Sequence, residues 1–346
     1  MTVKEIFSTY EKKELMYMAS IFGIDTKGET EALDEVSEKL LDDLSAFLLE
    51  KDHLQQNFYM FNDKEIDIIK RASSGPVDLE SSRTDLRAAL KVEQMSYGFI
   101  VYYGEKAKFT VPDEVQKVYR EIDSDVFDAK RKKLSWLYEC LGFCEQFYGI
   151  TPVDELQKVY NSRPKFQASM QDIMDMYAEL PSYRMSSILS SPIEGDESPV
   201  NIFVSNIFMD DRNLHVLMQT QKECDFKEFS YDQVKDYLDN GYLSGTLEYK
   251  ELLKFFQRDL DLDFTDADKL SQFIWKEFAT GAPFEPLFDE IIRRLESPSI
   301  DSAGKGAVIV TEPDKDELKS LMYKASGHTN SILYRGNMPI DINKKN

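Results

Sequence analysis

Apolar positions recur mostly at helical spacing along the chain. Near the start, "YEKKELMYMASIFGI" places Leu15, Met18, Ile21 and Phe22 on one side of a helix. "DTKGET" interrupts this pattern and "ALDEVSEKLLDDLSAFLLE" resumes it. The pattern predicts a helical module over residues 1–55, with two helices joined by an extended link.

The next segment changes from helical spacing to strand alternation. A helix that Asn62 or Asp63 can cap is followed by a turn in "GPVDLES" and by a third helix in "SRTDLRAALKVEQMSY". Alternation then predicts strands at residues 98–102 and 107–111 around a turn, and Pro112 opens another helix. Helices followed by a hairpin are the plan of a winged helix, which we expect over residues 56–123.

The same order of elements recurs further along. "LSWLYECLGFCEQFYG", "ITPVDELQKVYNS" and "KFQASMQDIMDMYAEL" read as helices, and "SYRMSSILSS" and "VNIFVSNIFMD" as strands around the loop "PIEGDESP". This predicts a second winged helix over residues 124–220.

Four capped amphipathic segments then predict a helical bundle over residues 221–298. Residues 299–346 read as a linker, a strand in "AVIV", a helix in "DKDELKSLMYKAS" and an irregular tail. The expected fold class is therefore mainly α with small β hairpins, built from tandem winged-helix modules and a helical bundle.

Charge and cysteine content narrow the setting. The 63 acidic and 42 basic residues give a net charge of -21, which disfavours nucleic acid overall and favours basic partners. Three cysteines without disulfide spacing suit a reducing compartment. Charges interrupt the first thirty residues and no apolar run approaches bilayer length, so we expect a soluble cytoplasmic protein without membrane contact.

Several stretches resemble a family of uncharacterised proteins abundant in Firmicutes. The points of likeness are "YEKKELMYMASIFGI", "GFIVYYGEKAKFTVPDEV", "FYGITPVDELQKVYN", "KEFSYDQVKDYLDNGYL" and "SGHTNSILYRG". The resemblance implies a module like the N-terminal one of transcription terminator Rho, then winged helices and often a zinc-binding SEC-C tail. No cysteine follows Cys224 here, so the zinc ligands of that tail are not carried over.

The helix before the first hairpin has one basic face. The residues of this helix face are Arg83, Thr84, Arg87, Lys91 and Gln94. Lys106 and Lys108 of the hairpin, or wing, could reach a neighbouring phosphate. In winged helices, this helix enters the major groove, where Arg and Gln read base edges and Lys neutralises phosphate. Leu86, Ala89 and Leu90 are expected to form the adjacent apolar face. The alternative is a solvated or protein-contacting helix face.

The corresponding helix of the second module argues for a protein partner. It carries Asp172, Asp175 and Glu179, which would repel phosphate. The run "KRKK" at residues 130–133 could touch an acidic surface or phosphate, but such runs usually face solvent.

No catalytic, metal or cofactor site emerges from the sequence. A calcium loop starting at Asp259 would need Gly and Glu where Phe264 and Leu270 stand, so the acids before this helix are expected to cap it. Cys140 and Cys144 lack further ligands at zinc spacing and are expected to be core thiols. Neither a phosphate-binding loop nor a nucleophile motif is present.

These observations favour a non-enzymatic binding protein, a protein-interaction adaptor or regulator of bacterial or phage origin. Two alternatives stay open: a winged-helix nucleic-acid-binding protein, and an acidic DNA mimic that occupies the DNA groove of a partner. The sequence does not set the oligomeric state.

Overall fold

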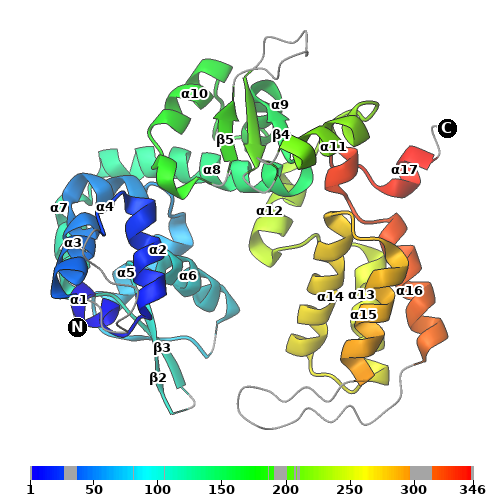
Figure 1. Ribbon diagram of the computed structural model, residues 1–346, viewed down its shortest axis with the longest axis horizontal. Coiled ribbons are helices and arrows are strands. Elements are labelled where there is room, and N and C mark those ends of the chain that lie inside the picture. Colours follow the sequence, from blue (N-terminus) through cyan, green and yellow to red (C-terminus); the bar gives the residue numbers. More distant parts are fainter. Residues whose placement is uncertain are drawn as a thin grey trace. The chain divides into compact units, whose positions relative to one another are not determined.

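The computed structural model describes residues 2–26, 37–80, 82–104, 106–185, 187–190, 201–205, 208, 211–296 and 314–343. Within these ranges the chain is mainly helical with small antiparallel sheets, which confirms the expected class at this level (Figure 1). Its contacts group into two compact units, Met1–Tyr138 with Gln171–Met185, and Glu139–Met170 with Ser186–Asn346. None of the described helices is long and apolar enough to cross a membrane. The expected bounds of the five modules stay predictions.

The first unit begins with four helices, where the pattern predicted two. They are α1 (Val3–Phe7), α2 (Lys12–Phe22), α3 (Glu38–Leu49) and α4 (Lys51–Phe58). On α3, Leu40, Leu44 and Leu48 recur every four residues and are all buried. Glu50 separates α3 from α4 and accepts a hydrogen bond from the His53 backbone N–H at 2.9 Å, so it caps the second helix.

The expected hairpin is present and gains a third strand. The elements are α5 (Asp63–Ala72), β1 (Val77–Asp78), α6 (Arg83–Gln94), β2 (Phe99–Tyr103), β3 (Lys106–Thr110) and α7 (Asp113–Ile122). The turn expected in "GPVDLES" contains β1, which pairs antiparallel with β3 to give the order β1-β3-β2. Pairing with β1 satisfies backbone groups on the outer edge of β3 that would otherwise stay open.

Local chemistry sets the ends of these elements. Asn62 caps α5 by accepting a hydrogen bond from the Lys64 backbone N–H at 2.8 Å, and Glu65 returns a carboxylate to the Asn62 N–H at 2.6 Å. Gly104 turns the hairpin with a φ of 65°, a left-handed conformation that glycine adopts without strain. Phe109 on β3 is fully buried, which fixes the face of the sheet that covers the helices.

Helix α8 (Asp125–Phe147) begins nine residues before the first position of the expected helix segment, and it includes the run "KRKK". The expectation that this run faces solvent is wrong for Arg131, which is 1% exposed. Its Nη1 donates to the Phe61 carbonyl at 2.7 Å, and its Nη2 donates to Asp63 and Asp128 at 2.5 and 2.6 Å. Burial of this cation is possible because each contact supplies a carbonyl or carboxylate acceptor.

A second small sheet follows. It contains β4 (Ile150–Pro152), β5 (Ser187–Ser190) and β6 (Ile202–Ser205) in the order β4-β6-β5, with α9 (Val153–Asn161) and α10 (Met170–Ala178) between the first two strands. The strand expected over "SYRMSSILSS" starts instead as a 3-10 turn, η1 (Ser182–Arg184), and becomes a strand only at Ser187. The loop "PIEGDESP" lies outside the described residues.

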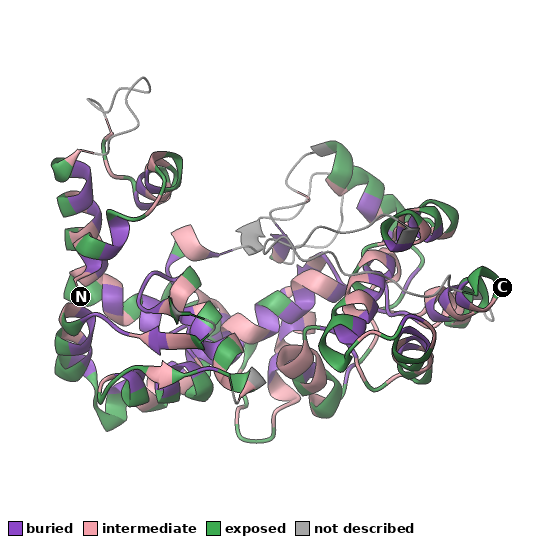
Figure 2. Ribbon diagram, turned by 90° about the horizontal axis from the view of Figure 1, so that it is seen from below, coloured by how far each residue is buried: buried purple, intermediate pink, exposed green. Residues whose placement is uncertain are grey.

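The helical segments expected after residue 220 are confirmed. Within the described residues they are α12 (Tyr231–Asn240), α13 (Leu247–Asp259), α14 (Phe264–Ala279), α15 (Phe284–Glu296) and α16 (Lys315–Gly327). Helix α11 (Asp211–Gln221), which precedes them, was not predicted. Figure 2 shows buried and exposed residues alternating around individual helices, as amphipathic packing requires. Asp263 caps α14 by accepting a hydrogen bond from the Asp266 N–H at 2.9 Å, which confirms the expected capping role for this acid. Asp259 instead ends α13 and accepts a hydrogen bond from the Arg258 Nε at 2.6 Å. The strand expected in "AVIV" lies outside the described residues.

The tail expected to be irregular is ordered around buried polar groups. It contains η3 (Ile332–Tyr334) and α17 (Pro339–Asn343). The Asn330 side chain donates to the Gly336 carbonyl at 2.6 Å, and the Thr329 and Tyr249 hydroxyls lie 2.8 Å apart. Gln221 donates to the Ile332 and Tyr148 carbonyls at 2.6 and 2.8 Å. Much of "SGHTNSILYRG" is thus a packing element of the second unit.

Cys140 and Cys144 are core thiols on α8, as expected. Both side chains are buried. Burial raises the pKa of each thiol well above its usual range, because the thiolate loses its hydration in an apolar environment.

We expect Gly98→Ala to destabilise the first unit. A Cβ at this position would lie 2.3 and 2.6 Å from two ring carbons of Phe109 and 3.1 Å from Val92, so the core under the hairpin would be overpacked. The expected loss is about 1–3 kcal/mol in the free energy of unfolding, measured by urea titration with circular dichroism. Gly142→Ala on α8 meets nothing within 4 Å and should stabilise slightly; equal melting of both variants would contradict this packing argument.

The thiols of Cys140 and Cys144 should resist alkylation in the folded protein. Their raised pKa leaves less thiolate at pH 8 than a free cysteine has, and burial blocks the reagent. Iodoacetamide labelling followed by mass spectrometry should modify both residues in urea but neither under native conditions. Rapid native labelling of either residue would show an accessible, reactive thiol instead.

Candidate binding site

Helix α6 carries an exposed apolar stripe. Leu86 is 37% exposed and Leu90 is 48% exposed, whereas Ala88, Ala89 and Val92 are buried. Within the expected apolar face of Leu86, Ala89 and Leu90, only Ala89 is buried and both leucines are exposed. The helix contacts α5 and β2, and the side that holds Ala88, Ala89 and Val92 is the covered one.

The predicted nucleic-acid contacts of α6 differ in their surroundings. Thr84 and Gln94 are exposed, and Arg87 is half-buried. Lys91 lies 3.6 Å from the Glu65 carboxylate and 5.5 Å from the centre of the Tyr138 ring. The Arg83 side chain lies outside the described part of the chain. Lys91 is thus engaged with protein groups on the side where phosphate contact was expected.

The two wing lysines are on β3, with their side chains on the face opposite Phe109. Lys106 is exposed, and Lys108 is half-buried. In the ladder Lys108 stands directly opposite Asp78 of β1, and opposite charges at such positions attract each other. Lys106 is therefore the more accessible of the two cations.

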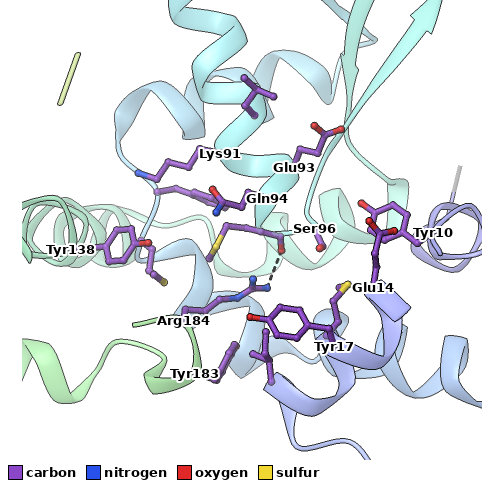
Figure 3. Close-up of a pocket in the computed structure, with 16 residues that line it drawn as sticks. Tyr10, Glu14, Tyr17, Lys91, Glu93, Gln94, Ser96, Tyr138, Tyr183 and Arg184 are labelled. Atoms are coloured by element: carbon purple, nitrogen blue, oxygen red, sulfur yellow. Dashed lines mark hydrogen bonds between the residues drawn. The ribbon is translucent and has the colours of Figure 1, made fainter. Parts of the chain in front are cut away.

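A groove of about 800 Å³ lies beside α6 within the first unit (Figure 3). Its lining comes from α2, the second half of α6, the link at Met60 and Phe61, Tyr138 of α8 and the η1 residues Tyr183 and Arg184. The groove includes Lys91 and Gln94 from the predicted set. The sequence pattern did not bring together α2, α6 and η1, which the tertiary structure places around one space.

Arg184 provides a cationic group to this lining. Its Nη2 donates to the Met95 carbonyl at 3.3 Å, a contact drawn in Figure 3, while its buried Nε has no hydrogen-bond partner among the described residues. The guanidinium lies 5.2 Å from the centre of the Phe22 ring and 5.8 Å from that of Tyr183. The Asn57 side chain donates to the Tyr183 hydroxyl at 2.7 Å and holds this aromatic neighbour in place.

The opposite side of the groove is acidic. Figure 3 shows Glu14, Glu93 and Tyr10 apart from Lys91, Tyr138 and Arg184. Burial, with the nearby carboxylates of Glu93 and Glu14, raises the pKa of Tyr10 to about 12, so its hydroxyl stays protonated. Glu93 accepts from the Ile100 N–H at 2.8 Å, and Glu14 accepts from the Glu11 N–H at 3.0 Å. Both acids therefore already serve backbone donors.

Apolar and aromatic side chains complete the groove. Met60, Phe61 and Met95 are buried beneath it, whereas Tyr17 of α2 is 68% exposed. Methionine side chains are flexible and polarisable, so a methionine-rich lining adapts to differently shaped apolar groups. The groove can accept an apolar side chain without a rigid match.

The end of α6 shapes the wall near Arg184. Ser96 is buried and has a φ of 65°, an unusual left-handed conformation for a residue other than glycine. Its N–H donates to the Glu93 carbonyl at 2.8 Å, and the Tyr97 N–H donates to the Val92 carbonyl at 3.2 Å. This turn closes the helix and leaves the Met95 carbonyl available to Arg184.

Sequence reasoning missed Arg184 and the stripe of groove residues that begins just before α2 and continues along it. Arg184 fell within an expected strand, so no interaction with α6 was anticipated. Tyr10, Glu14, Tyr17 and Ile21 recur at intervals of three or four residues, and this second periodic stripe could have signalled a functional face.

Among the residues that the structure describes, no group of three His, Cys, Asp or Glu side chains could hold a metal ion.

The chain matches no protein-family model, and searches of curated proteins and of solved structures return no match.

Proposed function

We propose that this chain is a non-enzymatic binding protein, an adaptor or regulator of bacterial or phage origin that holds a protein partner through the first unit. The observation that carries the proposal is the exposed pair Leu86 and Leu90 on α6, next to the groove. Two leucines one helical turn apart form a short apolar strip, which a partner can cover. Apolar contact contributes about 25 cal/mol for each Å² removed from water.

The charges around this strip also support a protein partner. Lys91 is engaged with Glu65 and Tyr138, and Lys108 stands opposite Asp78, so two of the expected phosphate contacts face protein groups. Leucines on the outer side of a helix add nothing to phosphate binding, which depends on cations.

Helix α10 provides a second surface of compatible character. Asp172, Asp175 and Glu179 are exposed, as the sequence predicted. Together with the net charge of -21, these acids favour partners that present basic side chains and disfavour nucleic acid.

The second candidate is a winged-helix nucleic-acid-binding protein. It is favoured by Gln94 and Lys106, which are exposed on the helix and the hairpin expected to contact DNA. The three-stranded sheet and the preceding helix are compatible with a winged helix, although a single helix, α6, lies between β1 and the hairpin.

We expect Leu86→Asp with Leu90→Asp to abolish capture of protein partners. Each substitution places a charge on the surface that a partner would desolvate. The measurement is a quantitative pull-down from bacterial lysate, compared by mass spectrometry. Val216→Asp with Leu247→Asp is the matched control, because these aliphatic residues are also exposed but belong to the second unit. Identical captured proteins for all three baits would contradict the proposal, whereas release of a DNA-binding partner by added DNA would favour DNA mimicry.

We expect no gel shift of duplex DNA or RNA at about 50 mM salt, where phosphate contacts are strongest. The protein that is tested should be the full chain, with Arg83→Glu plus Arg87→Glu and Lys106→Glu as site variants. A salt-sensitive shift that these variants remove would favour the second candidate. Lys117→Glu with Lys133→Glu changes two exposed lysines away from α6 and β3 and controls for overall charge.

A further inference from the structure

We propose that the groove beside α6 binds a short segment of a partner protein that inserts an apolar side chain over Met60 and Met95 and pairs a carboxylate with Arg184. This inference rests on the proposed protein-binding function and specifies the chemistry of the partner. The choice of a carboxylate depends on which polar groups in the groove already have hydrogen-bond partners within the described residues.

Arg184 has donor capacity that its surroundings do not use. A guanidinium carries five N–H donors, of which Nη2 donates to the Met95 carbonyl at 3.3 Å, and the side chain also forms a hydrogen bond with the Tyr183 hydroxyl. Within the described residues its Nε is buried without a hydrogen-bond partner, and an unsatisfied buried donor is costly. The aromatic ring faces at 5.2 and 5.8 Å stabilise the cation without supplying a carboxylate. A carboxylate can satisfy two of these donors at once.

The acidic residues of the groove do not call for a ligand cation in the same way. Glu93 and Glu14 accept backbone hydrogen bonds at 2.8 and 3.0 Å, so each already has a partner. A ligand cation on this side would compete with local structure for those carboxylates. A ligand group that pairs with a charge in the groove is therefore expected to be an anion, and Arg184 is the cation that it would contact.

The net charge of the chain limits how acidic the partner segment can be. At -21, the protein repels a segment that carries several negative charges before any contact forms. A segment with one carboxylate next to an apolar side chain, and with neutral or basic residues on either side, can pair with Arg184 and is not repelled by the net negative charge. Leu90 and Tyr17, both exposed and both part of the lining, can cover the anchor from two sides.

The test is a selection of random twelve-residue peptides, displayed on phage, against the immobilised full chain. Selected peptides should share one Asp or Glu at a fixed spacing from a large apolar residue. Synthetic fluorescent copies should bind in anisotropy titrations, and Arg184→Glu should weaken binding by about tenfold or more. Replacing the peptide's acid with Lys should restore part of the affinity for Arg184→Glu. Arg120→Glu, an exposed arginine of the same unit, should leave affinity within about twofold.

A second measurement does not depend on how Arg184→Glu folds. Hydrogen exchange of the wild-type chain with bound peptide should show protection in α2 and in the second half of α6, without protection of α13 to α16. The proposal is overturned if selection yields no binder, if binders lack the shared acid, or if protection lies elsewhere. A different result separates this inference from the proposed function. If Leu86→Asp with Leu90→Asp abolishes the pull-down of partner proteins but no peptide binds in the groove, the proposed function is retained and only this inference is rejected.

Discussion

The buried guanidinium of Arg131 is the interaction on which the first unit depends. It joins α8 to the link between α4 and α5 through the Phe61 carbonyl and the Asp63 carboxylate, with Asp128 as a third partner. A buried charge is tolerated only when its hydrogen-bonding groups are paired, so the position of α8 and the shape of this link are set together. The same link contributes Met60 and Phe61 to the groove, and the floor of the candidate site is therefore tied to this ion cluster.

A second buried polar network holds the groove from another direction. The Asn57 amide lies 3.0 Å from the Tyr97 hydroxyl and 2.7 Å from the Tyr183 hydroxyl, and thus connects α4 with the turn that follows α6 and with η1. Burial raises the pKa of both tyrosines, so both hydroxyls stay neutral and can take part in hydrogen bonds. Arg184 follows Tyr183 directly, and its location near Met95 is a consequence of this anchoring. Rigid support of this kind favours binding because little order has to be gained when a partner arrives.

Helix α6 and the groove beside it offer two kinds of contact, one apolar and one charged. Leu86 and Leu90 offer apolar area, which contributes affinity with little specificity. In the proposed interaction, Arg184 would pair with a carboxylate and would select among partners, because a segment without one would leave the guanidinium unpaired. The acidic surface elsewhere repels strongly acidic chains and so narrows the choice further.

The sequence by itself determined most helices, the first hairpin and the core thiols, because these follow from local periodicity, caps and turn residues such as Asn62, Gly104 and Asp263. It also determined the charge balance. It grouped Leu86, Ala89 and Leu90 on one apolar face but did not determine how α6 is rotated, because the packing partner α5 decides which side of an amphipathic helix is covered. The burial of Arg131 and the convergence of α2, α6 and Arg184 were likewise decided only by the tertiary structure, since the hydrogen bonds there join residues 68, 70 and 89 positions apart along the chain.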